Sequence, residues 1–225
     1  RSDTMMLATM PPFLPRMSLF SIPRDLWVEI PNVGQERINT AHYFAELDQP
    51  GTGMEAAAKT VEANFGISVP YVIRVRFDSI VNIVDAMGGV TINVKKATPM
   101  FEAGEQQMDG ARALAFVRDR SGGDDFSRQK HGQAFVVGAL KTMFNPLKWV
   151  RLPAVVLATI ESVDSNIPFY AWPRVIYGAL FSGVFGFDVH PFDRNWVTGW
   201  TTDQGAQVLL TNWDLLKPAV QQIFK

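Results

Sequence analysis

The spacing of hydrophobic and polar residues along this chain predicts short strands interleaved with helices. Alternating or continuous apolar runs predict strands over residues 4–10, 16–22, 26–30, 70–77, 90–94, 186–192 and 207–210. Helical periodicity predicts helices over residues 53–65, 79–87, about 107–117, about 125–144, 153–163, 168–181 and 213–224. Strands and helices mixed on this scale indicate a layered α/β or α+β domain.

The boundaries of several elements follow from single residues. Three prolines between residues 11 and 15 predict a turn between the first two strands. Gly66 is expected to stop one helix, and Asp78 is expected to cap the next, which Gly88-Gly89 ends. No linker of low complexity and no internal repeat interrupts the pattern, so a single domain is expected.

The first two strands are expected to bring two carboxylates and one guanidinium together. If Met10 pairs near Met17, Asp3 lies opposite Arg24 and beside Asp25. Two neighbouring carboxylates repel each other unless a cation intervenes, and Mg²⁺ is held by one or two carboxylates together with phosphate oxygens. The pair therefore predicts either half of a magnesium site or an ordinary ion pair between Arg24 and Asp3.

A second group of charges surrounds a short acidic loop. Arg118 and Arg120 follow a predicted helix, and Arg128 falls in the first turns of the next helix. Guanidinium groups offer paired donors to phosphate oxygens, and the start of a helix also favours an anion. The alternative is a solvated charged corner. Together, the arginines and the carboxylates fit a pyrophosphate that shares its charge with a metal ion.

Composition narrows the choice of ligand. The 225 residues carry a formal net charge of −1, which argues against broad electrostatic binding to nucleic acid and favours a discrete anion. Sixteen Phe and six Trp suggest a large core, an apolar pocket or both. The apolar stripes of two predicted helices could form either a core or a pocket. Their residues are Ile80, Ile83, Val84, Met87, Ala134, Phe135, Val137, Gly138 and Leu140.

Several classes of site and segment are excluded or not visible. The chain has no Cys, which excludes disulfides, thiolate chemistry and Cys-ligated metals. No apolar run reaches the roughly 18–20 residues that span a bilayer. No signal peptide is visible, and the chain begins at Arg1 without an initiator Met. We therefore expect a fragment of a longer protein, with any membrane anchor upstream of it.

Five ordered motifs carry a resemblance to a known family. They are Ser21-Ile22-Pro23-Arg24-Asp25, Arg37-Ile38-Asn39, Val84-Asp85-Ala86-Met87-Gly88-Gly89-Val90, Asp109-Gly110, and Ala113-Leu114-Ala115-Phe116-Val117-Arg118-Asp119-Arg120 leading to Asp125 and Arg128. In this order they resemble the LytR-CpsA-Psr family from residue 1 to about 140. The resemblance implies a three-layer α/β/α sandwich with a mixed central sheet and an apolar tunnel for a lipid tail. The predicted domains are a catalytic core over residues 1–145 and a C-terminal helical extension over 146–225, packed on the same domain.

The resemblance also implies an activity and a location. Family members transfer a glycopolymer from a polyprenyl-pyrophosphate carrier to a peptidoglycan hydroxyl, with Mg²⁺ as cofactor. The protein would act on the extracytoplasmic face of the bacterial cell membrane, held by an N-terminal anchor that is missing here. No nucleic acid is expected as a partner. Two other functions stay open: a polyprenyl-pyrophosphate hydrolase, and a regulatory module that binds polyprenyl phosphate without catalysis.

Residue roles are implied by the same motifs. Asp3 and Asp25 resemble the metal carboxylates. Asp25, Asp125 and Arg120 are the candidate catalytic residues, and Asp25 and Asp125 both stay open as the group that takes the hydroxyl proton. The side chains that resemble pyrophosphate ligands are Arg24, Arg37, Arg118, Arg120, Arg128 and Gln133. The family often has Arg-Gln before this glutamine, whereas here the positions are His131 and Gly132. A histidine is only partly charged at neutral pH, so one cationic contact with phosphate is uncertain.

Overall fold

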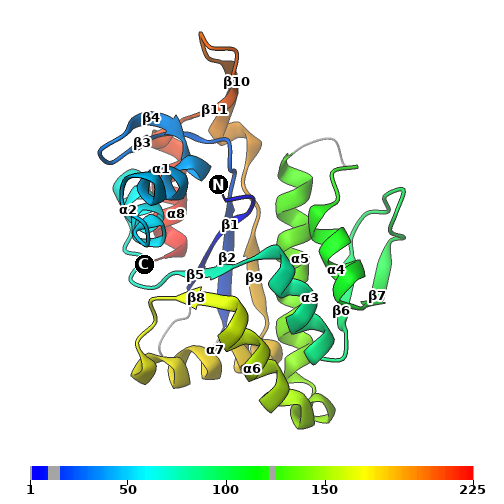
Figure 1. Ribbon diagram of the computed structural model, residues 1–225. Coiled ribbons are helices and arrows are strands. Elements are labelled where there is room, and N and C mark those ends of the chain that lie inside the picture. Colours follow the sequence, from blue (N-terminus) through cyan, green and yellow to red (C-terminus); the bar gives the residue numbers. More distant parts are fainter. Residues whose placement is uncertain (1, 10–15, 122–124, 225) are drawn as a thin grey trace. The chain divides into compact units, whose positions relative to one another are not determined.

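A computed structural model describes residues 2–9, 16–121 and 125–224 (Figure 1). The strands are β1 Met5–Thr9, β2 Met17–Ile22, β3 Trp27–Ile30, β4 Gly34–Arg37, β5 Ile73–Val75, β6 Val90–Val94, β7 Gly104–Met108, β8 Val163–Ser165, β9 Phe187–His190, β10 Val197–Thr201 and β11 Gln207–Thr211. The α-helices are α1 Ala41–Asp48, α2 Gly53–Phe65, α3 Phe77–Ala86, α4 Gly110–Arg118, α5 Asp125–Phe144, α6 Leu152–Ser162, α7 Trp172–Phe185 and α8 Trp213–Ile223. The 3₁₀-helices are η1 Ile38–Thr40, η2 Pro146–Arg151, η3 Phe169–Ala171 and η4 Arg194–Trp196.

The predicted α/β class is confirmed. Strands β1, β2 and β9 form one sheet in that order, and the other strands pair as β3-β4, β5-β8, β6-β7 and β10-β11. Helix α2 ends at Gly66, whose φ of 68° is left-handed, as the sequence predicts. The predicted turn over residues 11–15 lies outside the described residues.

Other boundaries differ from the prediction. Helix α3 begins at Phe77 after the extended residue Arg76, which makes no side-chain capping bond, so the prediction that Asp78 caps this helix is wrong. Asp78 lies in the first turn, where its charge still favours the helix dipole. The short elements β4, β7, β8, β10 and α1 were not predicted. Strands β4 and β7 are rich in Glu and Gln, so apolar periodicity gives no signal for them.

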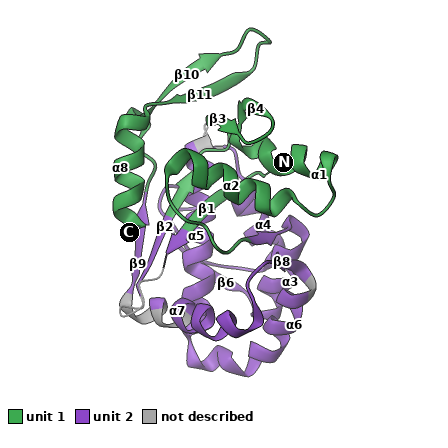
Figure 2. Cartoon of the chain, turned by 90° about the vertical axis from the view of Figure 1, so that its left-hand side faces the viewer, with its two compact units in different colours: residues 1–7, 20–72, 191–225 green, residues 8–19, 73–190 purple. Residues whose placement is uncertain are grey.

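The chain divides into two compact units (Figure 2). Unit 1 comprises residues 1–7, 20–72 and 191–225, and unit 2 comprises residues 8–19 and 73–190. This division is discontinuous in sequence, because both β1 and β2 contain a boundary. The domain limit expected at residue 145 stays a prediction.

Unit 1 is organised around the segment that follows β2. Leu26 is fully buried; its carbonyl accepts from the Ile38 amide at 2.8 Å, and it forms a parallel β-bridge with Leu209. Phe20 packs against Phe192 and Trp196 at centroid distances of 5.9 and 6.2 Å. This packing anchors the chain immediately before and after the Pro23-Arg24-Asp25 turn.

Unit 2 has its own hydrophobic core beneath α3, α4 and the β6-β7 hairpin. Its buried side chains are Ile80, Val84, Val90, Ile92, Val94, Phe101, Met108, Ala113 and Phe116. Ala134 and Phe135 of α5 pack against this cluster. Four residues that could have lined a lipid tunnel, Ile80, Val84, Ala134 and Phe135, therefore contribute to core packing. The tunnel itself stays a prediction.

Helix α5 covers the open edge of β6. The Thr91 amide of β6 donates to Oγ1 of Thr142 at 3.2 Å, which satisfies a group that strand pairing leaves unpaired. Gly138 permits this approach, since a Cβ atom there would lie 2.6 Å from the Thr91 carbonyl oxygen. The glycine within α5 is thus required by contact with the strand, although its backbone is helical.

Gly138→Ala tests this contact. Helix propensity alone predicts stabilisation by about 1 kcal/mol, since Ala favours helix interiors over Gly. The approach to Thr91 predicts instead a loss of about 1–3 kcal/mol in the free energy of unfolding, as for other overpacked sites. Urea denaturation gives the sign. Gly199→Ala is the control, because a Cβ there meets nothing within 4 Å; a Gly138→Ala protein as stable as wild type would contradict the packing described here.

Candidate functional site

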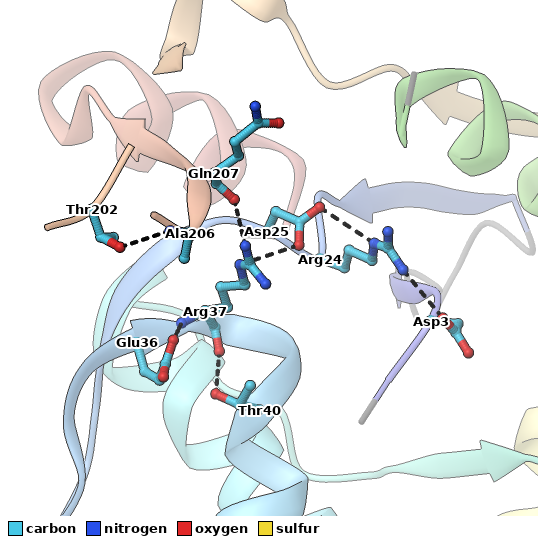
Figure 3. Close-up of polar contacts among 9 residues, drawn as sticks. All are labelled: Asp3, Arg24, Asp25, Glu36, Arg37, Thr40, Thr202, Ala206 and Gln207. Atoms are coloured by element: carbon cyan, nitrogen blue, oxygen red, sulfur yellow. Dashed lines mark hydrogen bonds and ion pairs between the residues drawn. The ribbon is translucent and has the colours of Figure 1, made fainter. Parts of the chain in front are cut away.

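Unit 1 brings two carboxylates and two arginines together at the turn after β2 (Figure 3). Nη1 of Arg24 lies 3.3 Å from Oδ1 of Asp3, and Nε of Arg24 lies 3.3 Å from Oδ2 of Asp25. Arg24 is therefore held between the two carboxylates. The predicted pairing of Arg24 with Asp3 is confirmed, and Asp25 lies beside them as the sequence predicts.

The backbone fixes the position of Asp25. The Leu26 amide donates to the Pro23 carbonyl at 3.3 Å, which closes the turn that contains Arg24 and Asp25. The Asp25 carbonyl accepts from the Leu209 amide at 2.9 Å. Because the next residue, Leu26, is fully buried, the Asp25 side chain is presented from a rigid segment.

Arg37 reaches the same carboxylate from β4. The antiparallel register of β3 and β4 pairs Arg37 with Trp27, close in sequence to Asp25. Nη2 of Arg37 donates to the Gln207 carbonyl at 2.7 Å, and Nε lies 3.5 Å from Oδ1 of Asp25. The buried Nε makes no hydrogen bond. The two oxygens of Asp25 thus face two different guanidinium groups.

The charges of this cluster decide what it can bind. Asp3 and Asp25 balance Arg24 and Arg37, so the four side chains have no net charge. A pyrophosphate brings several negative charges, and a divalent cation would compensate for them. Asp3 and Asp25 supply the hard oxygen donors that Mg²⁺ prefers, so the residues present fit this ion. Nowhere in residues 2–9, 16–121 and 125–224 do three His, Asp or Glu side chains gather in a metal-binding group.

Two buried polar atoms accompany the cluster and were not predicted as site groups. Oγ of Ser21 and Oδ1 of Asn39 are buried without a hydrogen-bond partner. The Asn39 amide donates to the Arg24 carbonyl at 3.3 Å, and the Asn39 carbonyl accepts from the Ser2 amide at 3.1 Å. Asn39 therefore ties the Arg24 turn to the segment that carries Asp3. Both residues belong to motifs of the sequence analysis, which is the signal that could have identified them.

Unit 2 contains the other predicted site residues. Arg118 is the last residue of α4, and its guanidinium lies 4.4 Å from the centroid of Phe77. Arg120 is exposed and forms no hydrogen bond or ion pair with any residue that the structure describes. Arg128, in the first turns of α5 as predicted, is buried, as is Gln133, whose Nε2 lies 3.4 Å from the His190 carbonyl.

The placement of the predicted residues is therefore mixed. Asp3, Arg24, Asp25 and Arg37 meet within unit 1, whereas Arg118, Arg120, Arg128 and Gln133 belong to unit 2. Their convergence on one cavity stays a prediction. Asp125 begins α5, and its side chain lies outside the described structure.

A buried aspartate organises the loop between the arginines. Asp119 accepts from the amide and from Oγ of Ser121, both at 2.9 Å. Burial alone would raise the pKa of Asp119, but these hydrogen bonds outweigh it and lower the pKa. The side chain is thus ionised and directed inward, so Asp119 positions the loop while Arg118 and Arg120 are exposed on either side of it.

His131 does not supply the cation that the family pattern often places there. Its ring packs against Phe116 at a centroid distance of 4.5 Å. Burial lowers the pKa of His131 below its ordinary value of 6.5, although the Asp119 carboxylate acts in the opposite direction. The imidazole is therefore mostly neutral at pH 7. No phosphate contact is therefore assigned to His131.

Other residues of the ordered motifs have structural roles. Oδ1 of Asp85 accepts from the Gly110 amide at 2.8 Å, and Asp109 caps α4 by accepting from the Arg112 amide at 2.8 Å. A Cβ on Gly110 would collide with the Val81 carbonyl oxygen, so this glycine allows α3 and α4 to pack closely. These motif positions support the fold.

Comparison with known proteins agrees with the motifs. The model of the LytR_cpsA_psr family matches residues 1–180. The polyisoprenyl-teichoic acid–peptidoglycan teichoic acid transferase TagU of Oceanobacillus iheyensis is 40% identical over 124 residues, which cover 53% of this chain and 38% of that protein. The regulatory protein MsrR of Staphylococcus aureus is 28% identical over 176 residues, covering 75% and 52%.

Solved structures show the same fold. The crystal structure of B. subtilis TagT superposes with a TM-score of 0.80 at 19% sequence identity, covering 99% of this chain and 84% of that chain. The chain spans only 35% to 55% of the length of the curated relatives with which it aligns.

His131→Phe tests the neutral histidine. Because the folded state lowers the pKa of His131, the unfolded chain binds the proton more readily, and wild-type stability should fall as the pH drops below the ordinary value of 6.5. The variant keeps an aromatic ring against Phe116 and should lose less stability between about pH 7 and pH 5. Urea denaturation across this range measures the slope. His42→Gln is the control, and equal slopes for wild type and His131→Phe would contradict the assignment.

Proposed function

The chain belongs to the LytR-CpsA-Psr family, and from this premise we propose that it is a Mg²⁺-dependent phosphotransferase. Its donor would be a glycopolymer on a polyprenyl-pyrophosphate carrier, and its acceptor a hydroxyl of peptidoglycan. The name of the Oceanobacillus iheyensis relative supports this substrate class. The observation that carries the proposal is the position of Arg24 between Asp3 and Asp25, with Arg37 beside Asp25, because such a set could bind both phosphate and a metal ion.

The arginines would bind and orient the pyrophosphate. Arg24 and Arg37 are about one quarter exposed, with side-chain values of 26% each, so ligands can reach groups that are partly desolvated. Electrostatic contacts are stronger in such surroundings than in open water. Arg120, which has no partner among the described residues, is available to neutralise charge on the leaving phosphate.

Asp3 and Asp25 would hold Mg²⁺. When bound, the ion would supply charge compensation for the pyrophosphate oxygens. In its absence, the contacts with Arg24 and Arg37 keep the two carboxylates from repelling each other and preserve the turn. The same contacts would fix the orientation of the guanidinium groups towards phosphate.

The chemical step is a substitution at phosphorus. The oxygen of a glycan hydroxyl attacks the sugar-linked phosphorus, a new P–O bond forms, and the bond to the bridging oxygen breaks. Polyprenyl phosphate leaves with the bonding electrons, and the hydroxyl proton passes to a carboxylate. Asp25 and Asp125 are the candidates. Both oxygens of Asp25 already face guanidinium groups, which favours a positioning role for Asp25.

The site of action would be the extracytoplasmic face of the bacterial membrane. A polyprenyl carrier is embedded in the bilayer, and peptidoglycan lies outside it. In the described part of the chain, no helix has the length and apolar character needed to cross a membrane. We propose that the longer protein carries an anchor before residue 1.

Asp25→Ala and Arg120→Ala test the proposal in different ways. Each should lower the rate of glycopolymer transfer about a hundredfold or more, as loss of a charge-stabilising group does in other enzymes. Thermal denaturation should show that Arg120→Ala is as stable as wild type, because Arg120 has no described partner. The assay supplies lipid-linked glycopolymer, peptidoglycan and Mg²⁺, and chelation of the metal should stop transfer.

Matched controls and product analysis complete this test. Asp48→Ala and Arg112→Ala remove exposed charges elsewhere in each unit and should keep full activity. Full activity in Asp25→Ala or Arg120→Ala would remove that residue from the mechanism. Release of free glycopolymer phosphate without an acceptor would indicate a hydrolase. Binding of the lipid without turnover would indicate a regulatory module, which the name of the MsrR relative makes a relevant alternative.

A further inference from the structure

Consecutive elements of unit 2 leave large apolar side chains in solvent. Leu147 and Val150 of η2 are 85% and 84% exposed, Ile160 of α6 is 72% exposed, and Phe169 and Tyr170 of η3 are 92% and 81% exposed. Single exposed hydrophobic residues are normal on a protein surface, but a concentration of them in neighbouring elements indicates a covered surface. We call these five residues, with Val156, Leu157, Ile176 and Tyr177, the apolar patch.

Helix α6 is apolar on opposite faces. Val155 is buried, and the Ser162 carbonyl at the end of the helix accepts from Oγ of Ser79 on α3 at 2.7 Å. The spacing of Val156, Leu157 and Ile160 places these exposed residues along one stripe. A helix that is apolar all round is ordinarily buried or in contact with lipid. In this protein, other elements cover only part of the surface of α6.

The neighbouring elements continue this arrangement. Leu147 and Val150 are three residues apart in a 3₁₀-helix and so share one side of it. Ile176 and Tyr177 are adjacent exposed residues of α7. Both views place α6 and α7 at the lower end of unit 2 (Figure 1, Figure 2). The two helices of the apolar patch therefore lie at the same end of this unit.

The segment that carries the apolar patch has a small excess of positive charge, and one of its cations, Lys148, donates to the Met87 and Gly88 carbonyls. Between residues 145 and 177 the cations are Lys148, Arg151 and Arg174, and the acids are Glu161 and Asp164. Asp164 is already paired with Arg74 at 2.8 Å. Trp149, Tyr170 and Tyr177 add the amphipathic aromatic groups that favour the boundary between water and lipid.

We propose that the apolar patch docks on the surface of a bilayer that contains anionic lipids. Apolar side chains would enter the boundary between headgroups and acyl chains, while Arg151 and Arg174 contact phosphate groups. The inference rests on the proposed function, because the polyprenyl carrier of the donor is itself in a membrane. A second copy of the chain is a poorer occupant, since a two-fold contact through this patch would place cations of one copy near those of the other.

Vesicle flotation tests the surface without any catalytic substrate. The whole 225-residue chain should float with vesicles of phosphatidylglycerol and phosphatidylcholine, and less with phosphatidylcholine alone. The double variants Leu157→Ser/Ile160→Ser and Phe169→Ser/Tyr170→Ser should each bind about tenfold more weakly. Arg174→Ser should bind about fivefold more weakly, and the difference should shrink in high salt. These side chains are exposed, so folding should be unaffected.

Leu47→Ser and Met100→Ser are the matched controls, because these residues are 65% and 62% exposed outside the apolar patch. Both should bind vesicles as wild type does. Absence of vesicle binding, or equal binding by all variants, would overturn the proposal. A dimer in sedimentation equilibrium that the double variants dissociate would overturn it in favour of a second copy. The vesicles contain no polyprenyl lipid, so this result is separate from the effect of Asp25→Ala on transfer.

Discussion

The contacts of Arg24 with Asp3 and Asp25 are the constraint on which the candidate site depends. Arg24 contacts both carboxylates, and Asp25 in turn faces Arg37. None of these contacts is strong by itself, because partly exposed ion pairs contribute little to stability. Their value is positional. Groups that could bind a metal ion and an anion are held around one turn, which lies between a buried strand and the bridge from Leu26 to Leu209.

Much of this local geometry could be predicted because it depends on residues near each other along a hairpin. Pairing of the first two strands placed Asp3 opposite Arg24, and a one-residue shift would have turned one of them to the other face. Helix α2 followed from its apolar periodicity and from Gly66. The contact of Arg37 with the Gln207 carbonyl joins residues far apart in sequence, and no local pattern predicts it.

The remaining differences arise where polar side chains satisfy tertiary contacts. Strands β4 and β7 lack apolar alternation, and Asp119 looks like one more charge in an acidic loop although it is buried and bonded to Ser121. Gly138 and Gly110 are two positions where a tertiary contact requires the absence of a side chain. The sequence offers no reason for either glycine, and the reason is a neighbouring carbonyl oxygen that leaves no room for a Cβ atom. Such requirements appear only once the elements are packed.

The two units differ in the kind of side chain that they present at the surface. In unit 1, buried residues such as Leu26 hold a polar turn at the surface, so that charge is presented from a rigid support. In unit 2, η2 and α6 instead leave apolar side chains exposed, although the unit has a well-packed core. The proposed transfer from a lipid-linked donor would use both properties. The phosphate would meet fixed donors in a partly desolvated setting, and the apolar patch would hold the chain on the bilayer that contains the donor.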